Sequence, residues 1–157
     1  MKKYELTSDT KIVFGHILYR IKALSSFGCV SAGDLGGFLE SEKNLSQNGD
    51  AWVYGDAEVY GDARVYGDAR VYGNAEVSKI GSIFWIGAVG SRNDTATFFR
   101  CTDGVVRVTC GCFFGNLDEF AKKVRKTHGD NDHAKVYMLA IDMAKIRIST
   151  EKEKTEE

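Results

Sequence analysis

Apolar residues recur with a period of six between residues 50 and 77. Alanine stands two residues before each of five evenly spaced valines, which are Val53, Val59, Val65, Val71 and Val77. Glycine followed by Asp or Asn separates the repeats, and these residues tolerate a positive φ at a corner. A period of six fits neither a helix nor a plain meander. We therefore expect a triangular coil whose interior is filled by the valines.

Three six-residue sides make one turn of eighteen residues, and successive turns stack like neighbouring strands of a parallel sheet. The sequence thus predicts a left-handed parallel β-helix of about three coils over residues 35–90. Leu35, Ile83 and Val89 keep the valine phase at its two ends. Residues 1–34 are expected to form an N-terminal β cap, with two strands around Gly15 and His16.

Residues 91–148 carry the patterns of a β-hairpin followed by two helices. Asp103-Gly104 between two strand-like runs is a strong tight-turn signal. Asn116 with Glu119 predicts an N-cap that opens a helix, and Gly129 closes it. A second helix is predicted over residues 131–148, with an apolar stripe made by Ala134, Tyr137, Ile141, Ala144 and Ile148. Residues 149–157 are charged throughout and predict a flexible tail.

The charge balance and the distribution of apolar residues argue against some classes of partner and location for this chain. The 21 basic residues nearly balance the 22 acidic ones, so no overall field favours a nucleic acid polymer or a membrane surface. No apolar run approaches the roughly 18 residues that a membrane span requires, and the N-terminus lacks the apolar segment of a signal peptide. We expect a soluble, cytoplasmic protein with four reduced cysteines.

The repeats also predict self-association. Residues eighteen apart share a face of the coil, so Tyr54 is expected to lie over Tyr72, and Tyr66 over Phe84. Large apolar patches are uncommon on monomers, and an aromatic exterior on a short coil favours burial against further copies. The expected partner is the protein itself, as a homotrimer or a higher multiple of three.

The predicted hairpin carries a candidate anion site. If Asp103 and Gly104 are the two central turn residues, Arg100 lies directly opposite Arg107. Like charges in this position repel, and an anion between them would offset the repulsion. Two guanidinium groups match phosphate oxygens. The alternative is that the arginines pair with acidic residues of the protein itself, among them Asp103, Asp118 and Glu119.

Five further residues, Phe98, Thr109, Arg92, Asn93 and His128, extend this candidate site. Phe98 lies opposite Thr109 in the same register and offers a ring for a nucleotide base. Arg92 and Asn93 precede the hairpin and add donors, and His128 follows it at the end of the first helix. The alternative for His128 is a cation that is stabilised at a helix C-terminus. Cys110 and Cys112 are interpreted as small buried thiols, because no second ligand pair at zinc spacing exists. No metal or cofactor is expected.

The Val-Tyr-Gly-Asp-Ala-Arg repeats resemble the left-handed β-helix proteins of the hexapeptide-repeat superfamily. With Leu18-Tyr-Arg-Ile-Lys before the repeats and Cys110-Gly-Cys-Phe and Thr127-His-Gly-Asp-Asn after them, almost the whole chain resembles phage and prophage proteins labelled putative transferase or polymer-forming. The resemblance implies the fold and a phage-like origin. It implies the cytoplasm of a host bacterium as the location, but no biochemical role.

The best-known members of that superfamily are acyltransferases and carbonic anhydrases, whose chemistry uses histidines on the coil. Here His16, His128 and His133 all lie outside the repeats. We therefore expect a non-enzymatic oligomeric binding protein that sequesters a small phosphorylated or nucleotide signal, such as one used in host defence. The alternatives are an acyltransferase-like enzyme that uses His128, and a structural trimerisation module.

Overall fold

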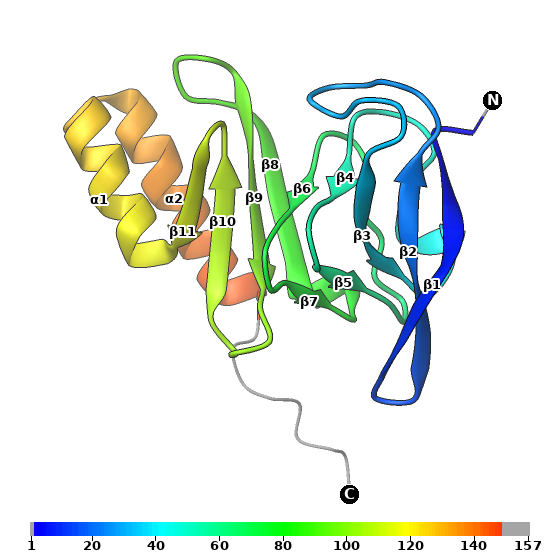
Figure 1. The fold of residues 1–157 in the computed structure, drawn as a ribbon. Helices are drawn as coiled ribbons and strands as arrows, with labels where there is room; N and C mark the ends of the chain where they lie inside the picture. Colours follow the sequence, from blue (N-terminus) through cyan, green and yellow to red (C-terminus); the bar gives the residue numbers. More distant parts are fainter. Residues whose placement is uncertain (1, 149–157) are drawn as a thin grey trace, which may run out of the picture. The chain divides into compact units, whose positions relative to one another are not determined.

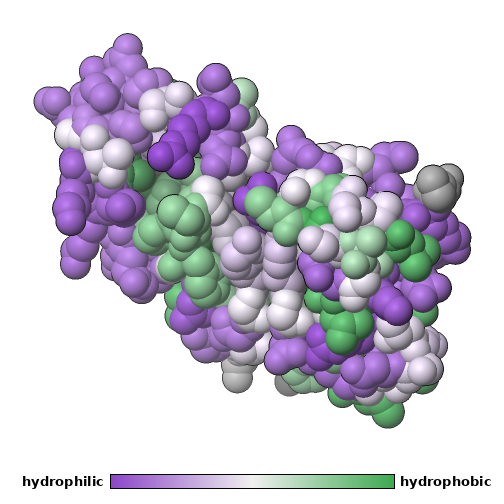
Figure 2. All heavy atoms as spheres, turned by 45° about the horizontal axis from the view of Figure 1, so that its top comes forward, coloured by the Kyte–Doolittle hydropathy of each residue, from purple (hydrophilic) through white to green (hydrophobic). Residues whose placement is uncertain are grey.

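The structure is a computed structural model that describes residues 2–148 (Figure 1). The predicted flexible tail, residues 149–157, lies outside the described residues. The chain divides into two compact units, Met1–Ile80 and Gly81–Glu157, and each is described by itself. On the face shown in Figure 2, hydrophilic side chains predominate, and apolar patches interrupt them in several places.

The first unit contains a five-stranded mixed sheet and a two-stranded parallel sheet. The larger sheet runs in the order β1-β2-β3-β5-β7, with the bounds Tyr4–Val13, His16–Ala23, Leu35–Leu39, Glu58–Val59 and Glu76–Val77. The smaller sheet pairs β4 (Trp52–Val53) with β6 (Arg70–Val71). A short 3-10 helix, η1 (Glu42–Asn44), follows β3, and a second, η2 (Ile80–Ser82), precedes β8.

The predicted left-handed β-helix of about three coils is wrong: the described residues form no β-helix. The repeats instead supply two-residue strands that pair at the eighteen-residue spacing, as Trp52 with Arg70 and Glu58 with Glu76. The third repeat contributes only an isolated bridge between Leu45 and Val65. The sheet then continues through β3 into an antiparallel hairpin, β1–β2, rather than into further turns.

The interior of the first unit follows the sequence pattern. Each alanine and each valine of the repeats is buried, from Ala51 and Val53 to Ala75 and Val77. Burial of the branched side chains is the main stabilising term in such a unit. The predicted strands around Gly15 and His16 are confirmed as β1 and β2, joined by a turn at Phe14 and Gly15.

The second unit is a four-stranded antiparallel sheet with two helices. The sheet runs in the order β11-β10-β9-β8, with the bounds Phe113–Asn116, Val106–Cys110, Asp94–Arg100 and Ile83–Val89. Helices α1 (Leu117–His128) and α2 (Asp132–Arg147) pack on one face and share a core with it. Ile83 and Val89, expected in the coil, belong to β8, because the segment between them lacks the Gly-Asp corner and stays extended.

The ends of both helices are as the sequence predicts. Asn116 and Glu119 form a reciprocal capping box at the start of α1, and the Gly129 N–H donates to Arg125 O at its end. Asn131 caps α2 by accepting from the Ala134 N–H. No helix among residues 2–148 is long and apolar enough to cross a membrane.

Candidate functional site

The β9–β10 hairpin does not place its two arginines opposite each other. Arg100 pairs with Val106, and Arg107 pairs with Phe99. The loop has three residues rather than two, because Gly104 at φ +78° ends a turn that the Cys101–Val105 backbone hydrogen bond closes at 3.0 Å. A shift of one residue reverses the face of every side chain, so Arg100 and Arg107 lie on opposite faces.

Arg107 pairs with an acidic residue of its own chain, which is the alternative that the sequence left open. Its guanidinium donates to both carboxylate oxygens of Asp103, at 2.9 and 2.8 Å. The ion pair lowers the pKa of the Asp103 carboxyl to about 2, chiefly through the hydrogen bond from Arg107. This guanidinium therefore neutralises a carboxylate of its own hairpin, and the paired-arginine site is not formed.

Phe98 and Thr109 lie inside the second unit. Phe98 is 0% exposed, and its ring packs against Phe84 and Phe120 with centroids 5.8 and 6.2 Å away. Thr109 is also buried, and it pairs with Thr97 rather than with Phe98. Neither side chain can meet a ligand at the surface.

The remaining predicted residues gather at the opposite end of the sheet, in the four-residue turn Gly90–Asn93 and at the α1–α2 junction. Figure 1 shows these two connections at the same end as the Gly111 turn between β10 and β11. Arg92 and Asn93 are exposed, and His128 is half-buried. We call this set of connections, with the side chain of Tyr137 between them, the Tyr137 end.

Tyr137 joins the three connections through its ring and hydroxyl. The hydroxyl donates to Val89 O at 3.4 Å and lies 3.8 Å from the Cys110 Sγ. Burial raises the pKa of the Tyr137 phenol, and the nearby Cys110 and Asp94 add to the effect. The tyrosine therefore stays a neutral donor. Its ring packs edge-on against Phe120, which anchors it in the core.

Two imidazole rings continue from Tyr137 toward the surface. The His128 ring stacks on the Tyr137 ring with centroids 5.8 Å apart and an interplanar angle of 24°. The His133 ring follows at 5.4 Å from that of His128 and is tilted by 55°. Residues from α1 and α2 thus present a row of three rings, and Tyr137, at one end of the row, meets Gly90 of the turn that carries Arg92 and Asn93.

The backbone around the Tyr137 end adopts unusual conformations. Ala88 and Asn93 have φ values of +55° and +50°, although neither is a glycine. The strand β8 is irregular between Ile86 and Val89, where the pairing with β9 shifts. Backbone of this kind persists only where the surrounding structure holds it, and it concentrates at functional sites.

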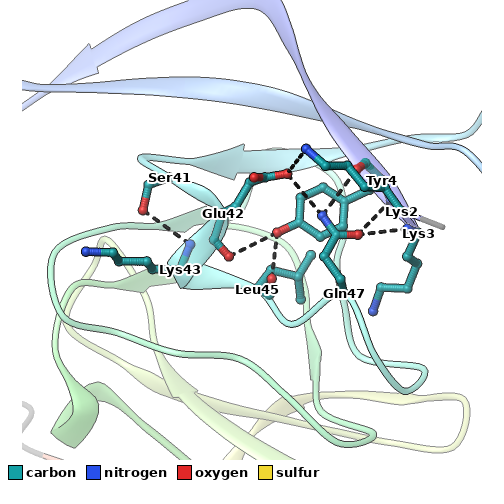
Figure 3. Close-up of polar contacts among 8 residues, drawn as sticks. All are labelled: Lys2, Lys3, Tyr4, Ser41, Glu42, Lys43, Leu45 and Gln47. Atoms are coloured by element: carbon teal, nitrogen blue, oxygen red, sulfur yellow. Dashed lines mark hydrogen bonds and ion pairs between the residues drawn. The ribbon is translucent and has the colours of Figure 1, made fainter.

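A second polar cluster joins the N-terminal residues to the segment that follows β3 (Figure 3). Lys3 is buried, and its ammonium donates to Ala51 O at 2.8 Å and Gly49 O at 3.2 Å. The Tyr4 hydroxyl donates to Leu45 O at 2.5 Å, and Gln47 bonds the Tyr4 backbone. These contacts of Lys3, Tyr4 and Gln47 hold the start of β1 against the segment that follows β3.

The charged groups on the outer face of the five-stranded sheet are also paired internally. Lys11 bonds Glu58 at 2.7 Å, and the Tyr60 hydroxyl donates to Glu76 at 2.9 Å. His16 bonds Glu40. The Lys11–Glu58 pair joins the β1–β2 hairpin to the repeats, and the His16–Glu40 pair joins it to the segment after β3. Sequence analysis did not anticipate them, because their partners are far apart in the chain.

Sequence analysis also missed Tyr137 and His133 as site residues. The helical stripe assigned Tyr137 to the core, which its burial confirms, but the pattern gives no sign that its ring meets His128. Cys110 is half-buried, whereas Cys112 is exposed in the turn after β10, which contradicts the expected burial of both thiols. Among residues 2–148, no group of three or more His, Cys, Asp or Glu side chains could hold a metal ion.

No protein-family model and no curated protein sequence matches this chain.

Proposed function

We propose that the protein is a non-enzymatic binding protein, and that the Tyr137 end takes a small phosphorylated molecule. The observation that carries the proposal is the stack of His128 on Tyr137 beside the turn that bears Arg92 and Asn93. Gly90, at the start of that turn, lies so close to the Tyr137 hydroxyl that a Cβ there would be 2.0 Å from it. The rings of Tyr137 and His128 and the turn that carries the donors Arg92 and Asn93 therefore belong to one region of the second unit.

The residue types suit an anion that also carries a ring. The Arg92 guanidinium presents a fork of donors that matches phosphate oxygens, and the Asn93 amide adds further donors. The His128 and His133 imidazoles supply flat surfaces on which a base can stack, and each gains a positive charge when it is protonated. The Asp94 carboxylate lies 3.1 Å from where a Cβ of Gly111 would stand, and because it would repel a phosphate we expect the phosphate on the histidine side.

This location replaces the one that the hairpin arginines suggested. Of the residues predicted from sequence, Arg92, Asn93 and His128 stay in the proposed site. Arg100, Arg107, Phe98 and Thr109 do not, because the first two lie at the other end of the sheet and the last two are buried. A role against host defence rests on the sequence resemblance alone.

The test is calorimetric titration of the purified protein with inorganic phosphate, mononucleotides and cyclic dinucleotides. We expect saturable binding of at least one nucleotide, and a loss of about tenfold or more in affinity for Arg92→Ala and for His128→Ala. Arg100→Ala is the matched control, since it removes the same group at the opposite end of the sheet. If no member of the panel binds, and heating the protein releases no small molecule detectable by mass spectrometry, the proposal fails.

A further inference from the structure

Helix α2 carries two apolar stripes rather than one. The first is buried against the sheet and α1 and consists of Ala134, Tyr137, Ala140, Ile141 and Ala144. The second is exposed, with Val136 at 41%, Leu139 at 63%, Met143 at 48% and Ile146 at 87%. Within residues 2–148, nothing covers this second stripe.

The two stripes lie on opposite sides of the helix. Each exposed position is two residues beyond a buried one, as Leu139 is beyond Tyr137 and Ile146 beyond Ala144, and two residues correspond to about 200° of helical rotation. Packing within the second unit therefore cannot explain the outer stripe. Four large apolar side chains on one exposed helical face indicate an interaction surface.

The spacing of the outer stripe identifies the kind of partner. The four residues are three, four and three apart, which is the spacing of the a and d positions in a coiled coil. In that register Val136 and Met143 occupy a, and Leu139 and Ile146 occupy d. A partner with the same spacing is required, and a second copy of the chain supplies one by two-fold symmetry.

We propose that α2 packs in parallel against α2 of a second copy of this chain, which makes the protein a dimer. In the first heptad, Val136 at a and Leu139 at d match the pattern that favours two strands, whereas Ile146 at d in the second heptad matches that of larger assemblies. Tyr137 faces away from the outer stripe, whereas His133 occupies an e position next to Val136 in the same register.

Charges beside the stripe select the parallel arrangement. Asp142 and Arg147 occupy g and e positions five residues apart, and these positions meet between parallel partners. Two symmetric ion pairs then form across the interface. An antiparallel arrangement would instead bring Asp142 beside Asp142 of the second copy, and the two carboxylates would repel. Among residues 2–148, neither Asp142 nor Arg147 has an ion-pair partner within its own chain.

The tyrosines of the repeats expose less apolar surface than the sequence suggested. Tyr60 is buried in a cluster with Leu18 and Phe38, and Tyr54 and Tyr72 stack on each other at 4.3 Å and are half-buried. Of these four repeat tyrosines only Tyr66 is exposed. The reason for expecting a trimer through the coil is therefore weaker than the reason for a dimer through α2.

The proposed interface is small. Stable interfaces bury roughly 800 Å² on each partner, and four side chains of one helix cover less. We therefore expect a dimer that dissociates at concentrations on the order of micromolar. Sedimentation velocity of the full chain across that concentration range should show a mass that rises from one copy to two.

Leu139→Glu buries a charge in the interface but leaves an exposed position of the monomer, so it should shift the dissociation constant by about tenfold or more. Lys145→Gln is the control, because it makes the same change of charge on the same helix outside the stripe. Circular dichroism verifies that both variants are folded.

A charge exchange tests the orientation. Arg147→Asp should weaken the dimer, and the double variant Asp142→Arg/Arg147→Asp should restore it, since the ion pairs are then reversed rather than lost. A monomer at all concentrations, a trimer, or an assembly that Leu139→Glu does not change overturns the proposal. Failure of the double variant to restore the dimer overturns the parallel orientation.

Discussion

The hydroxyl of Tyr137 lies against the backbone of Gly90, and this contact joins α2 to the turn between β8 and β9. A Cβ at position 90 would stand 2.0 Å from the hydroxyl and 2.7 Å from the ring carbon that bears it. Gly90 also has a φ of +74°, which L side chains rarely adopt. The position therefore requires glycine for two independent reasons.

Gly90→Ala should destabilise the protein by about 2 kcal/mol or more, because the tyrosine must move out of a packed core. Thermal unfolding measures the effect. Gly87→Ala, in the preceding strand β8, is the matched control, since its Cβ would meet only the Thr95 hydroxyl at 3.7 Å, and it should change stability by less than about 0.5 kcal/mol. Equal effects of the two variants would show that the Tyr137 contact is not rigid.

Variants of Phe98 distinguish between the two locations considered for the ligand, the β9–β10 hairpin and the Tyr137 end. Phe98→Ala should cost about 3–5 kcal/mol because the ring is wholly buried. Phe98→Leu keeps most of the apolar volume, so it should fold and leave nucleotide affinity unchanged. Phe114→Leu, at a more exposed position on the same sheet, is the control for stability. If Phe98→Leu folds like the wild type but loses binding, the ligand contacts the hairpin rather than the Tyr137 end.

The difference between the ligand location predicted from sequence and the Tyr137 end shows which features the sequence alone could predict. Local signals were reliable: the capping box of Asn116 and Glu119, the closing Gly129 and the inward valines of the repeats are all confirmed. The register of the hairpin was not, because Asp103-Gly104 is compatible with loops of two or three residues. The loop has three residues, and this difference of one residue places Arg100 and Arg107 on opposite faces of the sheet.

The prediction of the overall fold was wrong for a related reason. The six-residue period predicts which residues point inward, and it does so at Val53 and Val77 alike. It does not say how many successive turns will pair, or that β3 will accept an antiparallel hairpin as its neighbour. Those outcomes depend on contacts between residues far apart in the chain, such as Tyr19 with Leu39. The outer stripe of α2 was missed because a second apolar face does not alter the prediction of a helix.

Asp103 should make stability depend on acid pH. Its folded pKa of about 2 is below the usual 3.8, so its contribution is fully present above about pH 4 and is lost as the pH falls toward 2. Asp103→Asn keeps the acceptor for the Val105 N–H but not the charge. Because the pair is partly exposed, we expect an effect of at most about 1 kcal/mol.

Urea unfolding of Asp103→Asn at a series of pH values measures that effect. The variant should be less stable than the wild type near neutral pH and equal to it near pH 2. Asp68→Asn is the control, because the next repeat already carries Asn74 in the equivalent place. A constant difference across the whole range would mean that the ion pair with Arg107 does not form in solution.

Lys3 predicts a second pH dependence, in the alkaline range. Burial lowers the pKa of its ammonium from the usual 10.5 to about 8, although the charge of Asp50 opposes the shift. The folded state therefore releases a proton between pH 8 and 10.5 while the unfolded state keeps it, and stability rises with pH across this range. A neutral amine still has two N–H groups, which are enough for the carbonyls of Gly49 and Ala51.

Comparison of the wild type with Lys3→Met isolates this effect, because methionine has a similar length and does not titrate. The wild type should gain on the order of 2 kcal/mol relative to the variant between pH 8 and 10.5. Lys2→Met, which removes an exposed lysine paired with Glu42, should show no such gain. A flat difference for Lys3→Met would mean that the two carbonyls stabilise the charged ammonium enough to cancel the cost of its burial.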